Sequence, residues 1–560
     1  MRKFNSLFTK TWWAPVVVLI IFIVPTFFRL LRPGFFPMYD DMQVIRLQQM
    51  DKCVKDLQIP CRWVPDLGYG YGYPLFEFYA PLPYYFMEIY HLLGFSFIGS
   101  VKIGFIFGVL ISALAFYLLA RQFFSVWASV ASAILFAYIP IRAADLYVRG
   151  AMGEIWGMAS LPLLIFAIER TSRRKDKISV ALLALSVFIF LISHNLTVIM
   201  SVPLILLWLF FVPLRFSDNL KNIIKKLFTG FLIGILLASF FVIPLIVERN
   251  QVQLETLTYG YFNYLAHFAT VKQIFLSLNW GYGPSIAGPG DDLNLSMGVI
   301  QLIFALISLF IIFVNKKIVK KEKFFYLGLA ALMFSYLFLV HQKSTFIWQA
   351  LPFMAYIQFP WRLLFPAALI ASFLGGIFFN FIKEKYIGFL SFGAMLLLVL
   401  IYGNFFRPKS WFNISDQEKL SGESHENQIT ASIYDYLPRS AKYAPRVKAP
   451  SDIIFDTASG QVEGSQKGSD WFRYRLDITK EGKVVIPTFD FPGWKVWVDE
   501  DRVNYAKYGD LGLLAVNVQT GNHEVYARLT SSTSRKVGNE LSVLGLISFG
   551  LLVVRKNKYV

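Results

Sequence analysis

Residues 12–31 read WWAPVVVLIIFIVPTFFRLL, and a polar segment that begins MYDDMQVIR at residues 38–46 follows them. The first stretch is an apolar run of the length that crosses about 30 Å of hydrocarbon as a helix. It follows Arg2, Lys3 and Lys10, as in a signal peptide, but it lacks a small-residue cleavage site and is too long for a cleaved segment. We therefore expect it to remain in the membrane, with the polar segment at a membrane surface.

The composition of the whole chain agrees with this interpretation. Hydrophobic residues make up 56% of the 560 residues, and the mean hydropathy is +0.52. A soluble chain of this size would carry more charged surface. Apolar runs predict about twelve spans, of which the third, fourth and twelfth are short. They lie at about 12–31, 101–120, 125–140, 155–169, 179–194, 196–213, 227–247, 296–314, 324–341, 361–382, 386–405 and 540–554.

The positions of Lys and Arg predict the orientation, because positive residues near helix ends resist translocation. Beyond the N-terminus they cluster after even-numbered spans, at Arg121, 170–177, 215–226, 316–323, 383–385 and 555–558. We therefore expect a multi-pass membrane protein with both termini in the cytoplasm. Much of the net charge of +18 is this topology signal, and it predicts no nucleic-acid partner.

The chain divides into three predicted parts. Residues 1–405 form the multi-span domain, which includes a first exterior loop at 33–100. Residues 406–538 are polar, with short apolar alternations such as Val484–Ile486 and turn pairs such as Pro492-Gly493, which predicts an exterior β-sandwich. Residues 539–560 form the last helix and a basic cytoplasmic tail.

Both cysteines, Cys53 and Cys61, lie in the first exterior loop. Outside the cytoplasm a disulfide between them would pin that loop, and two unpaired thiols are the alternative. Zinc binding is not predicted, because no second pair of ligands accompanies them.

Ionisable residues gather on the predicted exterior side, where keeping them near lipid is costly, so each is a candidate for function. Simpler interpretations remain open for several of them. The aspartate pair can cap a helix, the arginines and acids of the second loop can form structural ion pairs, and the histidine can be an interface anchor. The candidates are Asp40, Asp41, Arg142, Asp145, Arg149, Glu154, His194, Asn195, Trp361 and Arg362.

Several sequence blocks carry a resemblance to a known group of membrane proteins. They are Tyr39–Leu47, Ile59–Pro74, Phe78–Tyr85, Tyr147–Glu154, Ser193–Thr197 and Gln358–Arg362. These blocks resemble the GT-C glycosyltransferase superfamily, and within it the bacterial 6-pyruvoyl-tetrahydropterin-synthase-related membrane proteins. Phe491–Val496 and Gly521–Val525 resemble the exterior sandwich of the neighbouring YfhO-like proteins. Pterin chemistry is not expected, because the six histidines are dispersed and do not form the clustered zinc set of a soluble pterin synthase.

This resemblance implies a GT-C-like helical bundle in the bacterial plasma membrane that transfers a sugar from a polyprenyl-phosphate-linked donor. The acceptor would be a glycan, lipid or protein of the cell envelope. Asp40 is the first choice for the general base and Asp41 the second, at a position where the family often has His-Asp and this chain has Tyr39. His194 is then the nearby imidazole, and Glu154 a further catalytic candidate.

A glycosyl transition state needs a carboxylate for the acceptor and cations for the departing phosphate. Arg149, Arg362 and Arg142 are the predicted cations, because the planar guanidinium binds phosphate oxygens in pairs. Asp145, Asn195 and Trp361 complete the predicted substrate site. A divalent metal such as Mg²⁺ or Mn²⁺ stays open, although adjacent carboxylates on a helix start diverge by about 100° and rarely share an ion.

Two other function classes stay open. A lipid flippase or transporter would also place ionisable groups within a bundle, but the halves show no internal repeat and the polar residues gather on one side. A non-catalytic scaffold that displays the sandwich would tolerate a change of Asp40 but not the loss of residues 406–538.

Overall fold

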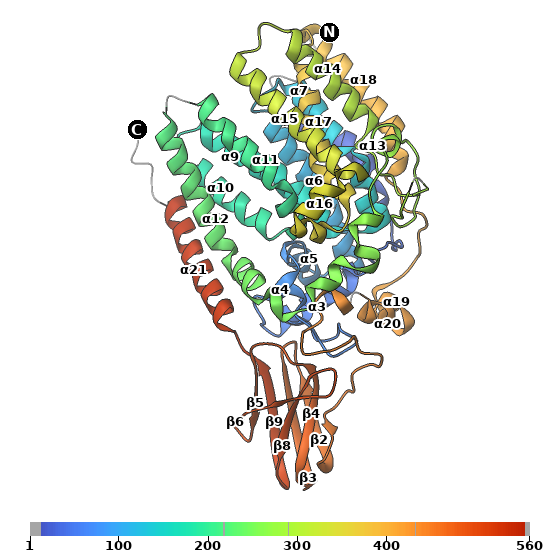
Figure 1. The fold of residues 1–560 in the computed structure, drawn as a ribbon, viewed down its shortest axis with the longest axis vertical. Coiled ribbons are helices and arrows are strands. Elements are labelled where there is room, and N and C mark those ends of the chain that lie inside the picture. Colours follow the sequence, from blue (N-terminus) through green and yellow to red (C-terminus); the bar gives the residue numbers. More distant parts are fainter. Residues whose placement is uncertain (1–12, 217–218, 289, 432, 555–560) are drawn as a thin grey trace.

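The computed structural model describes residues 13–216, 219–288, 290–431 and 433–554. Within these ranges nine helical segments are long and apolar enough to cross a membrane, which confirms the predicted mainly helical membrane fold. They pack as a bundle with a β-sandwich beyond one end (Figure 1). Their helices are α2 (Ala14–Phe27), α6 (Phe97–Ala120), α9 (Met152–Arg173), α11 (Asn195–Arg215), α12 (Leu220–Glu248), α15 (Lys320–Val340), α17 (Leu364–Asn380), α18 (Glu384–Tyr402) and α21 (Thr533–Val554).

The remaining three predicted spans are shorter or bent. The third is α7 (Val126–Ala137) followed by α8 (Pro140–Ala144) and the turn η2 (Asp145–Arg149), with a bend of 48° between the two parts. The fifth and eighth are α10 (Lys177–Leu191) and α14 (Val299–Val314), of 15 and 16 residues.

The expectation that the fourth and twelfth spans are short is wrong, because α9 and α21 each have 22 residues. Polar residues near the ends of α9 and α21 shorten the apolar runs from which the spans are predicted. In α9 these include Glu154 and Glu169, which are paired with arginines inside the bundle.

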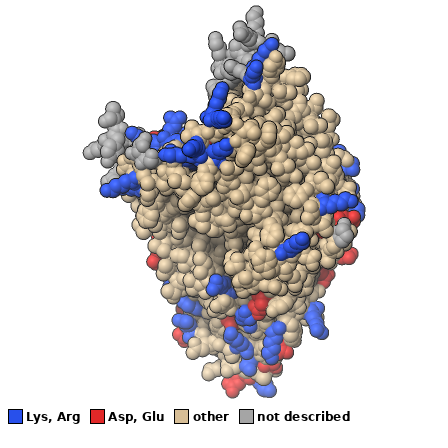
Figure 2. Space-filling model, turned by 45° about the horizontal axis from the view of Figure 1, so that its top comes forward, with Lys and Arg blue, Asp and Glu red and all other residues tan. Residues whose placement is uncertain are grey.

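One end of the bundle is strongly basic. Lys226 at the start of α12 donates hydrogen bonds to the carbonyls of Thr171 and Arg174 after α9, at 2.8 and 2.6 Å, and Arg215 of α11 pairs with Glu169. Figure 2 shows Lys and Arg concentrated at this end, whereas both signs mix near the sandwich. The gathering of Lys and Arg at one end of the bundle agrees with the clusters predicted between the spans. The clusters at Arg2, Lys3 and Lys10 and at 555–558 lie outside the described residues.

The sandwich is antiparallel and occupies residues 454–529. One sheet has the strand order β1-β4-β8-β7 and the other β2-β3-β9-β5-β6. Residues of β3 alternate between the core, as at Phe472 and Tyr474, and the outer face, as at Arg473. The strands are β1 (Ile454–Phe455), β2 (Ser459–Lys467), β3 (Trp471–Lys480), β4 (Gly482–Phe489), β5 (Trp494–Val498), β6 (Asp501–Val503), β7 (Ala506–Tyr508), β8 (Leu513–Val518) and β9 (Gly521–Leu529).

Shorter helices lie among the long ones, several of them at the end of the bundle that faces the sandwich (Figure 1). Residues 406–453 contain two of them and wrap the first exterior loop, where Asp416 accepts hydrogen bonds from the backbone N–H of Phe97 and Ile98 at 2.6 and 2.9 Å. The short helices are α3 (Gln43–Lys55), α4 (Leu75–Phe78), α5 (Leu82–Leu92), α13 (Val271–Leu276), α16 (Thr345–Ala350), α19 (Asp416–Lys419) and α20 (Gly422–Thr430).

The first exterior loop is part of the sandwich core. Trp63 packs against Phe491 and Trp494, with ring centroids 5.9 and 5.6 Å apart, and Tyr71 packs against Phe489. Each of these loop rings is almost fully buried. The sandwich is therefore fixed to the bundle by apolar burial and is not a freely tethered module.

A buried ion network joins the same junction to α21. Glu77 accepts from Arg62 at 2.8 Å and from Arg535 at 3.2 Å, and Arg535 also reaches Glu248 at 2.7 Å. Arg535 lies in the first turns of α21 and Glu248 ends α12. The final helix is thus locked to the first exterior loop.

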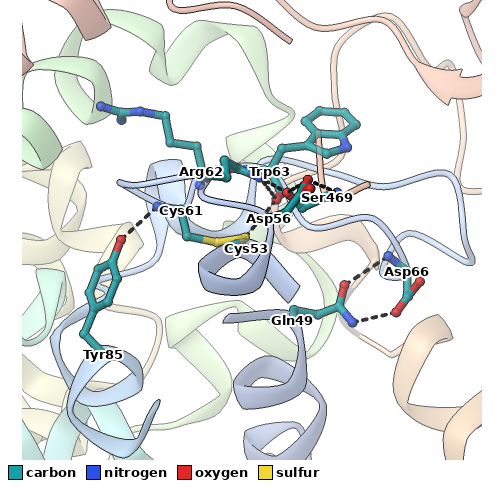
Figure 3. Close-up of a disulfide and its surroundings, with 10 residues drawn as sticks. Gln49, Cys53, Asp56, Cys61, Arg62, Trp63, Asp66, Tyr85 and Ser469 are labelled. Atoms are coloured by element: carbon teal, nitrogen blue, oxygen red, sulfur yellow. Dashed lines mark hydrogen bonds between the residues drawn. A yellow bond between two sulfur atoms is a disulfide. The ribbon is translucent and has the colours of Figure 1, made fainter. Parts of the chain in front are cut away.

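Cys53 and Cys61 form a disulfide (Figure 3). Of the two possibilities left open by the sequence, a disulfide or two unpaired thiols, the structure shows the disulfide. The bond fastens the end of α3 to the following loop. Asp56, between the two cysteines, accepts hydrogen bonds from the backbone and hydroxyl of Ser469 at 2.7 and 2.8 Å and from Trp471 at 3.0 Å. The disulfide loop therefore also anchors the sandwich.

Candidate active site

A cavity of about 600 Å³ lies where the bundle meets the first exterior loop. Its walls come from that loop, the start of α9, the junction of α10 and α11, the end of α12 and the segments before α13, α14 and α17. Seven of the ten candidate residues line it, although they are spread over more than 300 positions of sequence. They are Asp40, Arg149, Glu154, His194, Asn195, Trp361 and Arg362.

The centre of the polar wall is an ion cluster around Glu154. Its Oε1 accepts from Arg149 Nη2 at 2.8 Å and from Arg362 Nε at 2.9 Å. Arg149 also pairs with Asp145. Gly150 makes this arrangement possible: its φ of +68° turns the chain from η2 into α9, and a Cβ there would lie 2.1 Å from Met38 Sδ.

Aromatic rings hold both guanidinium groups in place. Arg149 lies over the Trp361 ring at 4.7 Å, and Arg362 lies over Phe359 at the same distance. Arg362 Nη1 further donates to Gln358 Oε1 at 2.8 Å. The two cations are thus positioned before any ligand binds, which favours recognition of an anion.

Asp40 lies directly beside this cluster. Its backbone N–H donates to the carbonyl of Arg149 at 2.8 Å. Its carboxylate accepts from Arg46 at 2.8 Å and from Gln43 at 2.9 Å, and its side chain remains 33% exposed. Asp40 is therefore an oriented carboxylate with an open side toward the cavity.

Asp41 lies outside the cavity lining. Its carboxylate pairs with Lys419 of α19 at 2.6 Å. Burial raises the pKa of Asp41, although Lys419 opposes that shift. Of the two adjacent aspartates, only Asp40 is placed to meet a ligand in the cavity.

His194 caps α11 beside Glu154. Its Nδ1 lies 2.9 Å from Thr197 Oγ1, and Gly153 allows the close approach of α9 to the ring. Desolvation lowers the pKa of His194 to about 4, so the imidazole is neutral near pH 7. Asn195 donates to the Phe78 carbonyl at 2.7 Å, and its buried Oδ1 has no hydrogen-bond partner among the described residues.

Two expected substrate-binding residues lie behind the cavity wall. Asp145 is fully buried and holds Arg149 from the far side. Arg142 is also fully buried and stacks on Phe136 at 4.6 Å, and its guanidinium has no hydrogen bond within the described part of the chain. Neither side chain lines the cavity, so their predicted contact with substrate is not supported by this arrangement.

Other cavity residues were not predicted from the sequence. Arg46 pairs with Asp40 from six positions further along the chain, a separation that is not one of the helical pairing spacings and gave no local signal. Asp435 and Tyr436 come from the connection before the sandwich, where no local signal indicates the site. The apolar lining includes Leu196, Leu245, Leu254 and Leu257.

The carboxylates do not gather into a metal site. Among the described residues no group of three or more His, Cys, Asp or Glu could hold a metal ion. Asp40 meets Arg46, and Glu154 meets two arginines. A donor set already neutralised by cations does not fit Mg²⁺ or Mn²⁺, which prefer several unpaired oxygen ligands.

Comparison with sequence families gives one match that covers more than half of the chain. A family model described as "6-pyruvoyl-tetrahydropterin synthase related domain; membrane protein" matches residues 76–409. A protein of Lactococcus lactis subsp. cremoris, itself uncharacterized, is 27% identical over 258 residues. That alignment covers 44% of this chain and 40% of the relative.

Comparison with solved structures gives distant similarities. The arabinofuranosyltransferase AftD from Mycobacteria has a TM-score of 0.44 and 13% identity, covering 71% of this chain and 27% of that one. The apo oligosaccharyltransferase of Archaeoglobus fulgidus has a TM-score of 0.47 and 12% identity, covering 80% of this chain and 62% of that one. The chain therefore spans less than two thirds of each of these proteins.

Proposed function

The chain belongs to the 6-pyruvoyl-tetrahydropterin synthase related family of membrane proteins, and on that premise we propose that it is an integral membrane glycosyltransferase. It transfers a sugar from a polyprenyl-phosphate-linked donor to an acceptor of the cell envelope. The observation that carries the proposal is that Asp40 and the guanidinium groups of Arg149 and Arg362 lie beside one another in the same cavity. The resemblance of these sequence blocks to GT-C enzymes supports it.

Asp40 is the proposed general base. The acceptor hydroxyl loses its proton to Asp40 while its oxygen forms the new bond to the anomeric carbon of the sugar. The bond from that carbon to the phosphate oxygen breaks, and the phosphate leaves with the electron pair. Arg46 and Gln43 orient the Asp40 carboxylate for this step.

Arg149 and Arg362 are the proposed partners of the departing phosphate. In Arg362, Nη1 is used by Gln358 and the Ile357 carbonyl and Nε by Glu154, so Nη2 is the group left for a ligand within the described residues. Glu154 is then a positioning residue that holds both cations, and Asp145 holds Arg149 from behind. Preorganised cations of this kind stabilise charge that develops in the transition state.

The remaining lining fits the rest of a lipid-linked donor. Neutral His194 and Asn195, which both line the cavity, are the proposed contacts of the sugar hydroxyls. The leucines of α11, α12 and the following connection give an apolar wall for the first isoprene units. Membrane lipid would surround the remainder of the tail.

The test uses the full chain in nanodiscs and a panel of polyprenyl-phosphate sugars. We expect wild-type protein to transfer sugar and release polyprenyl phosphate, and Asp40→Asn to reduce transfer at least 100-fold. Asp41→Asn is the matched control, because Asp41 lies outside the cavity lining, and it should retain activity. Equal loss in both variants would contradict Asp40 as the base. Absence of turnover with every donor would favour a flippase or a scaffold.

A further inference from the structure

The outer face of the five-stranded sheet carries a row of three aromatic rings: Trp471 on β3, Tyr526 on β9 and Trp497 on β5. The ring centroids of Trp471 and Tyr526 are 6.5 Å apart, and those of Trp497 and Tyr526 are 5.5 Å apart. The strand pairing puts these residues opposite the core-facing positions, and each ring is partly exposed. The rings form a continuous apolar strip across three strands.

The same face is basic. Arg473 lies over the Tyr526 ring at 5.1 Å, and its side chain is 48% exposed. Strand register places five cations and one carboxylate around the rings. They are Arg473, Arg475, Arg528, Lys495 and Arg502, with Glu524 as the carboxylate on these strands and Asp56 bonded to the edge of the Trp471 ring.

Stabilisation of the sheet alone does not account for this pattern. Cross-strand aromatic pairs do stabilise sheets, but like charges directly opposite each other destabilise them. Lys495 is paired with Arg528 across β5 and β9, and Trp471 faces Arg528 from the other side. Two adjacent cations on an exposed sheet repel each other, and Asp470, which lies near Arg528, offsets only part of this cost.

We propose that this face binds an anionic glycan, a chain of sugar rings that bear carboxylate or phosphate groups. The apolar faces of the sugars pack on Trp471, Tyr526 and Trp497, and the cations pair with the acidic groups. The charge of the face and the charge of the ligand are complementary. This inference goes beyond the proposed function, because binding here needs no chemistry in the cavity.

The outer face of the sheet lies close enough to the cavity for a bound glycan to be near it. Trp471 Nε1 donates to Asp56, just after α3, and α3 begins close to Asp40. A helix of 13 residues is about 20 Å long. A glycan held on the sheet is therefore near the cavity mouth without occupying it.

The experiment measures binding of polymers to the full chain in phosphatidylcholine nanodiscs, where the lipid carries no net charge. The probes are polygalacturonate and hyaluronate, which are acidic sugar polymers, dextran, which is neutral, and polyphosphate, which has no sugar rings. We expect saturable binding of the acidic sugars, with dextran and polyphosphate each at least tenfold weaker. Trp497→Ala with Tyr526→Ala should weaken binding of the acidic sugars at least tenfold.

A second variant separates binding from folding. Lys495→Gln with Arg502→Gln should weaken binding of the acidic sugars at least tenfold while the melting temperature stays equal, because both side chains extend from the outer face of the sheet. Tyr443→Ala with Arg446→Gln changes an exposed ring and an exposed cation elsewhere and should bind as wild type. Absence of saturable binding, equally tight binding of polyphosphate, or unchanged binding in either variant would overturn the proposal.

Discussion

Two carboxylates on the same helix show how similar ion clusters can differ in use. Glu154, near the start of α9, and Glu169, near its end, are each held by two arginines. In both clusters the arginines stack on aromatic rings, Trp361 and Phe359 at one end and Phe123 and Phe325 at the other. The helix thus carries one motif at both ends of the bundle.

The difference is in how completely each carboxylate is satisfied. Glu169 is fully buried and accepts hydrogen bonds on both oxygens, from Arg173, Arg215 and Trp208. Glu154 accepts on Oε1, and the cavity lies beside it. An ion pair alone therefore does not mark a site, and a cluster with unused bonding capacity beside a cavity is the better indicator.

The largest effect expected from this comparison is on stability. Glu169→Ala leaves the buried guanidinium of Arg215 without its partner and removes the bonds of Glu169 to Arg173 and Trp208, which costs about 3–5 kcal/mol in the free energy of unfolding. Glu154→Ala should cost less, under about 2 kcal/mol, because cavity water can solvate its arginines. Denaturant titration in detergent micelles would measure both values. A cost for Glu154→Ala that equals the cost for Glu169→Ala would remove the distinction.

Sugar-transfer activity should depend more on the Glu154 cluster than on the Glu169 cluster, which is the reverse of the order expected for stability. Arg362→Gln removes one cation from the departing phosphate and should lower kcat/KM for sugar transfer by about 100-fold. Arg215→Gln changes the Glu169 cluster and should leave kcat/KM per folded molecule unchanged, although less folded protein is recovered. Assays on purified, monodisperse protein separate the two effects. A similar kcat/KM loss in both variants would show that the cavity cluster has no special role in the reaction.

Part of this comparison was within reach of the sequence. The spans, the basic connectors and the spacing of Arg149 and Glu154 are local signals, and they located the bundle and one ion pair. The contact between Glu154 and Arg362 joins residues 208 positions apart, and the assignment of Asp435 to the cavity depends on how the sandwich connection folds back. The burial of Arg142 and Asp145 behind the wall is likewise set by the bend between α7 and α8.

A smaller effect is expected when a methyl group is added to α9 at Gly153, beside the cavity. A Cβ at Gly153 would lie 2.8 Å from His194 Cδ2, so Gly153→Ala must displace the imidazole. Overpacking of this kind costs about 1–3 kcal/mol, and we expect sugar transfer to fall about tenfold. Gly393→Ala in α18 is the control, because its Cβ would meet nothing within 4 Å. Wild-type transfer rates in Gly153→Ala would show that the His194 position is unimportant.

The smallest effect concerns pH. His194 has its pKa lowered from 6.5 to about 4, so the unfolded chain binds a proton that the folded chain does not between these values. The contribution of His194 to stability is present above pH 6.5 and is lost as the pH falls toward 4. The difference in unfolding free energy between wild type and His194→Gln, measured from pH 7.5 to 4.5, should shrink on acidification. A constant difference would contradict a neutral buried imidazole.

The ion network at Arg535 determines when, during synthesis of the chain, Glu248 and Glu77 can acquire their cation. Glu248 pairs with Arg535, which is translated 287 residues later, and Glu77 needs the same arginine for its second bond. Until the ribosome has reached Arg535, near the start of α21, Glu248 at the end of α12 lacks its cation. Full assembly of the first loop, the sandwich and α12 is therefore a late event, and a chain released before Arg535 would enter the membrane with that carboxylate still unpaired.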